Sequence, residues 1–229
     1  MTHERYKSDC RDDPAYSIAE AAHHLNVPIA TIRYWSLGRE HYEPLIELPA
    51  HSENLLSFLN LVELHVLAAI RRKYRVSMPK VRTAIDYLKR NTRSQKDKRH
   101  PLLSKALETD GLDLFVEQFG ALINISKDGQ VAMRNVLKNA LKRIERDERG
   151  LPVRLFPFTR SSIESAPSII VIDPRLSAGR PVISGTGLAT EIIAERYKAG
   201  ESIEELARDY ERPAEEIEEA VRCELQTAA

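Results

Sequence analysis

Residues 16–35, YSIAEAAHHLNVPIATIRYW, decide how the amino-terminal part of this chain folds. Ser17 followed three positions later by Glu20 forms a capping box, and this pattern predicts a helix over residues 18–25. The Asn-Val-Pro sequence that follows breaks this helix, and its proline suits the first turn of a second helix over residues 28–37. Two short helices joined by a tight turn predict a helix-turn-helix unit.

Beyond this unit, the hydrophobic pattern predicts further elements in the first hundred residues. Residues 45–56 read as a short hairpin, and residues 58–74 and 78–89 have the apolar spacing of helices. Residues 91–100 are polar throughout, which indicates a charged linker at a domain boundary.

The rest of the chain has a mixed pattern. Strands are predicted at residues 112–119, 121–126, 151–158, 169–172 and 182–183, and helices at 130–149, 190–199, 203–210 and 213–225. The expected fold class is therefore mainly α with a small β component (α+β). We expect four parts, which are a polar arm (residues 1–14), an N-terminal domain with its linker (15–100), an α+β middle segment (101–167) and a three-helix C-terminal domain (168–229).

The net charge of zero hides an uneven distribution of charge. Residues 1–100 carry 17 Lys and Arg against 12 Asp and Glu, whereas residues 161–229 carry 7 against 14. Residues 71–99 alone hold 12 basic side chains. The two ends of the molecule are therefore expected to face different partners.

The N-terminal helix pair has an echo 185 positions later in the chain. Six residues match by type between the two pairs. Because capped helix pairs share the same local sequence requirements, chance similarity explains these matches slightly better than a duplication does, and both explanations stay open. The matching residues are Ser17, Ile18, Glu20, Ala22, Pro28 and Ile32 in the first pair, and Ser202, Ile203, Glu205, Ala207, Pro213 and Ile217 in the second.

The second helix of the first pair is expected to expose basic side chains, whereas the second helix of the later pair is expected to expose acidic ones. This difference favours DNA binding by the first pair over a purely structural role. Affinity for DNA comes largely from neutralising phosphates, and a recognition helix presents its exposed side chains to the major groove. Arginine reaches phosphate or guanine, and hydroxyl groups reach phosphate. The candidate DNA-binding residues are Ser17, Thr31, Arg33, Tyr34, Arg39, Arg71, Arg72 and Lys73.

Residues 16–35 resemble the DNA-binding domain of the MerR regulators. The continuation LLSF at residues 55–58, followed by LVEL at residues 61–64, looks like the wing and third helix of that family. The resemblance covers about residues 14–90. It implies a winged helix-turn-helix domain that binds operator DNA as a homodimer.

The C-terminal part resembles a second family through the motifs IDP at residues 172–174, GRPVI at 179–183 and AGESI at 199–203. These are similar to domain-of-unknown-function family 433, whose members are commonly described as VapB-like antitoxins encoded beside a PIN-like ribonuclease toxin. The resemblance implies the antitoxin of a type II toxin–antitoxin pair, which represses its own operon and neutralises the toxin. An acidic surface suits a basic ribonuclease, so the candidate partner-binding residues are Arg180, Glu215, Glu216 and Glu219.

The alternative is a MerR-type, ligand-responsive transcriptional regulator without a toxin partner. Such a regulator needs an apolar pocket for its effector. Four aromatic side chains of the middle segment are available for one, although a plain core would also require them: Phe115, Phe119, Phe156 and Phe158.

No pattern typical of an enzyme, metal site or cofactor site stands out, so we expect a non-catalytic protein without a cofactor. His23 and His24 are adjacent on a helix and therefore point apart. Cys10 and Cys223 lie near opposite ends, which argues against a disulfide framework and suits a reducing cytoplasm. No apolar run approaches the roughly 20 residues that span a bilayer, so no membrane partner is expected.

Overall fold

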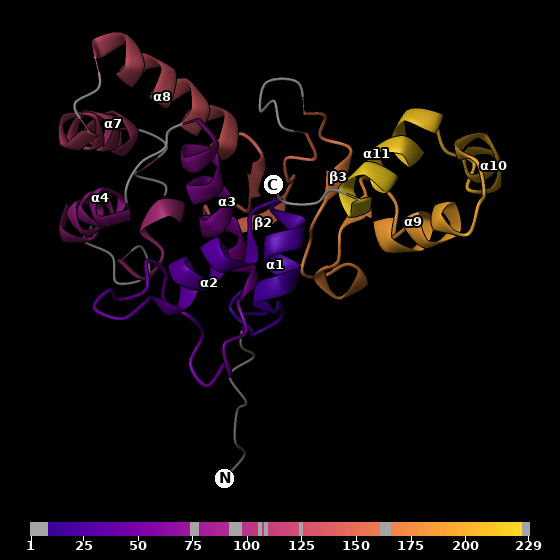
Figure 1. Ribbon diagram of the computed structural model, residues 1–229, viewed down its shortest axis with the longest axis horizontal. Coiled ribbons are helices and arrows are strands. Elements are labelled where there is room, and N and C mark those ends of the chain that lie inside the picture. Colours follow the sequence, from indigo (N-terminus) through magenta and orange to yellow (C-terminus); the bar gives the residue numbers. More distant parts are fainter. Residues whose placement is uncertain are drawn as a thin grey trace.

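Figure 1 shows a computed structural model in which α1, α2 and α3 lie between a lobe containing α4, α7 and α8 and a lobe containing α9, α10 and α11. The predicted polar arm and charged linker lie largely outside the described residues. The structure describes residues 9–73, 78–91, 98–104, 107, 110–123, 126–160 and 166–225.

The N-terminal helix pair forms where the sequence predicts it, as α1 (Ile18–His24) and α2 (Ile29–Leu37). The Ser17 hydroxyl accepts a hydrogen bond from the Glu20 amide at 3.1 Å, and the Glu20 carboxylate accepts one from the Ser17 amide at 2.8 Å. The capping box is therefore confirmed. At the other end of the pair, Gly38 terminates α2 with a φ of 76°, a conformation that favours glycine.

Two further helices of the N-terminal region, α3 (Phe58–Lys73) and α4 (Met78–Asn91), are confirmed within their described residues. Ser57 begins α3, since its hydroxyl accepts from the Asn60 amide at 3.2 Å while the Asn60 side chain accepts from the Ser57 amide at 3.1 Å. Both residues are fully buried. This reciprocal cap satisfies backbone groups that would otherwise lie unpaired in the core.

The hairpin predicted at residues 45–56 is wrong. The amides of Leu45 and Ile46 donate to the carbonyl of Trp35 at the end of α2, and Leu56 forms an isolated bridge with Tyr16 instead. The two segments therefore hydrogen-bond to different parts of the N-terminal region.

The strands predicted at residues 112–119 and 121–126 are also wrong, because α7 (Asp110–Ile123) covers most of this stretch. Leu112, Phe115, Val116 and Phe119 are all buried, and their spacing of three, four and seven positions places them on one helical face. Residues 124–125 lie outside the described part. The short 3-10 helix η1 (Pro101–Leu103) precedes α7, and α8 (Lys127–Leu141) follows it.

The helix predicted over residues 130–149 ends early, because α8 stops at Leu141 and the chain turns into a hairpin. Strand β1 (Ile144–Arg146) pairs antiparallel with β2 (Pro152–Leu155). The connection is stabilised by Asp147, whose carboxylate accepts hydrogen bonds from the amides of Arg149 at 3.0 Å and Leu151 at 2.9 Å. Side-chain hydrogen bonds of this kind compete with helix formation.

The C-terminal lobe contains the predicted strands and helices. Its elements are β3 (Ile170–Val171), the 3-10 helix η2 (Ser177–Gly179), β4 (Val182–Ile183), α9 (Thr190–Lys198), α10 (Ile203–Asp209) and α11 (Ala214–Leu225). β3 pairs antiparallel with β4, and a bridge between Leu155 and Ile172 joins this lobe to the middle segment. In the described part of the chain the fold is therefore mainly helical with two small antiparallel sheets, as predicted.

The sequence echo corresponds to a shared backbone geometry. Asn26 between α1 and α2 has a φ of 49°, and Glu211, which lies 185 positions later between α10 and α11, has a φ of 52°. The residue after each donates its amide to a carbonyl five positions earlier at 2.9 Å. Ser202 and Glu205 form the same capping box as the first pair. The two helix pairs therefore share cap and turn, whether or not they share an origin.

Candidate nucleic-acid and partner interfaces

A surface depression of about 530 Å³ lies along α2. Three arginines line it, two from α2 and the loop after it and one from the carboxyl-terminal part of α3, and all three are exposed. Five of the eight predicted DNA-binding residues therefore come together here. The described residues that line it are Ala30, Thr31, Arg33, Tyr34, Gly38, Arg39 and Arg71.

The backbone at the mouth of this depression is held by local contacts. Arg39 and Tyr42 exchange two backbone hydrogen bonds, of 2.9 and 2.7 Å. The rings of Tyr34 and Tyr42 meet edge to face, with centroids 6.5 Å apart. Because none of the described lining residues carries a carboxylate, the guanidinium groups create a positive surface that suits an anionic ligand such as phosphate.

Of the other three predicted DNA-binding residues, Ser17 and Arg72 are not among the described residues that line this depression. Ser17 uses its hydroxyl to cap α1. Lys73 ends α3, and its side chain is outside the described part of the structure. Arg72 differs from the prediction, because its guanidinium donates to the carbonyls of Leu25 at 2.8 Å and Arg160 at 3.4 Å. Burial lowers the pKa of Arg72, and its role is to hold segments of the chain together.

Arg72 belongs to a buried junction around Phe158 that sequence reasoning missed. The His65 ring stacks on Phe158 with centroids 4.7 Å apart, and Arg72 and Arg143 lie 5.4 and 4.8 Å from the same ring centroid. The guanidinium of Arg143 donates to four backbone carbonyls within residues 156–167. Burial lowers the pKa of Arg143 to about 10 and that of His65 to about 3. Phe158, Phe115 and Phe119 are core residues, so these rings line no open effector pocket.

On the predicted partner surface, the expectation that Glu219 is exposed is wrong. Glu219 is fully buried on α11, where it accepts hydrogen bonds from the Thr159 hydroxyl and from Arg160, the latter at 2.7 and 3.2 Å. Arg222 lies 3.5 Å from the same carboxylate. This residue fastens the segment before the C-terminal lobe to α11 and has no surface left for a partner.

The remaining predicted partner residues are accessible to different degrees. Glu215 is exposed. Glu216 is half-buried and pairs with Arg212 at 2.6 Å. Arg180 is exposed and forms an ion pair with Glu191 at 2.8 Å on the surface of the lobe.

The N-terminal helix pair and the C-terminal lobe meet at α1 and α11. The Nε2 atom of His23 lies 3.0 Å from a Glu224 oxygen, and this contact raises the pKa of His23. The Thr190 hydroxyl donates to the other oxygen of Glu224. Near this contact, Tyr16 donates its hydroxyl to the carbonyl of Gly179 at 3.0 Å. The two ends of the chain are therefore joined by specific polar contacts.

Within the residues that the structure describes, no group of three or more His, Cys, Asp and Glu is arranged to hold a metal ion. None of the described helices combines the length and apolar character needed to cross a membrane.

The C-terminal lobe is similar in sequence to a known protein family. Residues 170–222 match the model of a family described as "Protein of unknown function (DUF433)". This match covers β3 through most of α11.

Two proteins of Mycobacterium tuberculosis are similar over nearly the whole chain. The "Putative antitoxin VapB45" is 28% identical, with 92% of this chain and 93% of that protein covered. The "Uncharacterized protein Rv2308" is 27% identical, with 92% and 90% covered. The X-ray crystal structure of Rv2018 from the same organism has a TM-score of 0.68 at 26% identity and covers 92% of this chain and 98% of that one.

Proposed function

We propose that this chain is the antitoxin of a type II toxin–antitoxin pair. Residues 15–100 bind operator DNA and repress the operon, and residues 168–229 hold and neutralise a PIN-like ribonuclease toxin. The observation that carries the DNA-binding half is the depression along α2, where five predicted DNA-binding residues meet. The antitoxin role is supported by similarity to the "Putative antitoxin VapB45" along nearly the whole chain.

In the proposed complex, α2 lies in the major groove. Arg33 reads a base edge, while Arg39 and Arg71 neutralise phosphates on either side. The chain acts as a homodimer in the cytoplasm, and its two half-sites lie about one helical turn, roughly 34 Å, or a multiple of that distance apart. This arrangement is the one that the resemblance to MerR regulators implies.

Toxin binding is assigned to the acidic C-terminal lobe. Glu215 and Glu218 on α11 are exposed, and Glu218 is the positional counterpart of Arg33 in the first helix pair. A ribonuclease needs a basic track for RNA, so an acidic antitoxin surface steers the two proteins together. Because Glu219 is buried, it takes no part in this contact.

DNA binding is tested by titrating labelled upstream DNA with the full chain at several salt concentrations. Arg33→Ala should weaken specific binding by about 1–3 kcal/mol, and Arg71→Ala should reduce the salt slope by about one. Arg149→Ala is the matched control, because Arg149 is exposed but lies outside the depression. Equal losses in all three variants, or no affinity for any upstream fragment at low salt, would refute the assignment.

Toxin binding is tested with the product of the neighbouring gene, if that gene encodes a small nuclease with an acidic active site. Association of the Glu215→Lys/Glu218→Lys variant should be slower than that of the native chain, with a larger difference at low ionic strength. An unchanged rate at both ionic strengths would remove α11 from the interface. Failure of any nuclease to co-purify, together with intact DNA binding, would favour the ligand-responsive regulator instead.

A further inference from the structure

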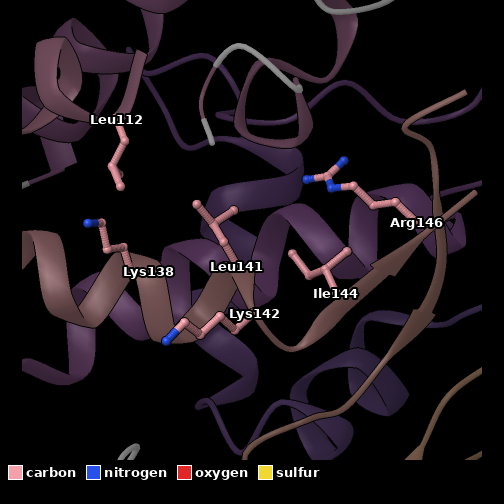
Figure 2. A pocket seen from close by; sticks show the side chains of 6 residues that line it. All are labelled: Leu112, Lys138, Leu141, Lys142, Ile144 and Arg146. Atoms are coloured by element: carbon pink, nitrogen blue, oxygen red, sulfur yellow. The ribbon is translucent and has the colours of Figure 1, made fainter. Parts of the chain in front are cut away.

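A second cavity, of about 340 Å³, lies between the beginning of α7, the end of α8 and β1, far in sequence from the DNA-binding candidates. Figure 2 shows its side chains, with Lys138 extending toward Leu112. The lining is Leu112, Lys138, Leu141, Lys142, Ile144 and Arg146. The lining therefore combines three apolar side chains with three cationic ones, and none of the described lining residues is acidic.

The two lysines of this cavity lack a partner within the described part of the chain. Lys138 and Lys142 are four positions apart on one side of α8 and the turn after it, both are exposed, and neither forms an ion pair with a described residue. Like charges at this spacing repel each other and lower helix stability. An anion bound between them would remove this repulsion.

Three acidic residues that directly neighbour lining residues in sequence form ion pairs elsewhere. Asp147, next to Arg146, pairs with Arg11 at 2.7 Å. Asp113, next to Leu112, pairs with Arg134 at 2.8 Å. Glu145, next to Ile144, pairs with Arg154 at 3.2 Å. The positive charge of the cavity is therefore not neutralised by these neighbouring carboxylates.

Arg146 lies at one side of the cavity in a fixed position. Its Nη1 atom donates to the carbonyls of Leu103 at 2.7 Å and Gly150 at 2.9 Å, which anchors the guanidinium at one side of the cavity. The lysine side chains are free to adjust, whereas Leu141 and Ile144 are almost fully buried and form a rigid apolar floor. The lysine ammonium groups beside this apolar surface are the combination that selects an amphipathic anion.

We propose that this cavity binds a small amphipathic carboxylate, with the carboxylate at the lysines and an apolar body on Leu112, Leu141 and Ile144. If each non-hydrogen atom takes about the 30 Å³ share of a water molecule, the volume accommodates a ligand of roughly ten such atoms. A simple inorganic anion would leave the apolar floor uncovered, and a neutral apolar molecule would leave the lysine charges unpaired. This site is independent of the proposed toxin-binding and DNA-binding roles.

Isothermal titration of the full chain with octanoate tests the proposal. Octanoate should bind, while acetate and octylamine should bind at least tenfold more weakly, because the first lacks the apolar body and the second has the wrong charge. The Lys138→Gln/Lys142→Gln variant should lose about tenfold in octanoate affinity, as expected for two partly exposed ion pairs. Lys127→Gln is the matched control, since Lys127 is exposed at the other end of α8, outside the cavity.

Three results would overturn the proposal: no octanoate binding at millimolar concentration, equal binding of octanoate and octylamine, or the same affinity in the double variant and the Lys127 control. Vesicles that contain an anionic lipid should not compete with octanoate, and competition would instead identify a membrane-binding surface. Circular dichroism of the double variant should match that of the native chain, so that lost binding is not confused with lost folding.

Discussion

Replacing Glu219 by Ala distinguishes a structural carboxylate from a partner-binding one. In the structure Glu219 is fully buried and accepts hydrogen bonds from Thr159 and Arg160, which lie about sixty positions earlier in the chain. Glu215, one turn earlier on the same helix, is exposed. The two glutamates are alike in sequence context, so the comparison isolates the effect of burial.

The expected loss of stability in Glu219→Ala follows from the Thr159 hydroxyl, which the substitution leaves without its partner. Thr159 is only 2% exposed, and without Glu219 its hydroxyl loses its side-chain partner. Leaving a buried hydroxyl unsatisfied costs about 1–3 kcal/mol. For a chain of this size, about 2 kcal/mol lowers the melting temperature by roughly 4–8 °C. Glu215→Ala should change the free energy of unfolding by no more than about 0.5 kcal/mol, as surface substitutions usually do.

Thermal unfolding of the three proteins, followed by far-ultraviolet circular dichroism and by tryptophan fluorescence, measures this difference. The single tryptophan, Trp35, is a buried residue of α2 and therefore reports on the N-terminal region alone. Because Glu219 fastens the C-terminal lobe to the rest of the chain, Glu219→Ala should shift the circular dichroism transition more than the fluorescence transition. Equal melting temperatures for Glu219→Ala and Glu215→Ala would refute the structural role.

Two further perturbations probe the contacts between the ends of the chain. Gly179→Ala should destabilise the protein by about 1–3 kcal/mol in urea denaturation, because Gly179 has a φ of 78° and an added Cβ would collide with the Tyr16 hydroxyl. Gly185→Ala, with a similar φ but open space around it, isolates the backbone part of that cost. Glu224 raises the pKa of His23 in the folded state. The His23–Glu224 contact therefore adds stability that is fully present below the unfolded pKa of about 6.5. This stability is lost as the pH rises through the folded pKa. His23→Gln should therefore be less stable than the native chain at pH 5.5, with the difference shrinking by pH 8.5, and a constant difference across that range would contradict the assignment.

The elements with local signals were predictable from the sequence. Both capping boxes, the turn after each first helix and the short strands near Ile170 and Val182 form as expected, because their determinants lie within a few residues of one another. In α7 the sequence carries two conflicting signals. Leu112, Phe115 and Phe119 have helical spacing, but the short apolar run LFV at residues 114–116 favours a strand when taken by itself.

The candidate sites were predictable only where neighbouring positions of one element bring the side chains together. Thr31, Arg33 and Tyr34 lie on one short helix, so the sequence could place them together. Arg72 and Glu219 could not be assigned in this way, because their partners lie 47 to 88 and 59 to 60 positions away. Periodicity identifies a helical face, but it does not reveal which distant segment covers that face.

The two helix pairs show why charge, rather than backbone shape, carries the information about partners. Ile32 and Ile217 occupy equivalent positions and are both fully buried, so the core imposes the same requirement on each pair. Arg33 and Glu218 occupy the next equivalent position and are both exposed, so folding leaves that position free to differ. One capped turn can therefore present a basic surface at one end of the chain and an acidic surface at the other. Opposite charges at positions that the fold does not use agree with the different partners proposed for the two helix pairs.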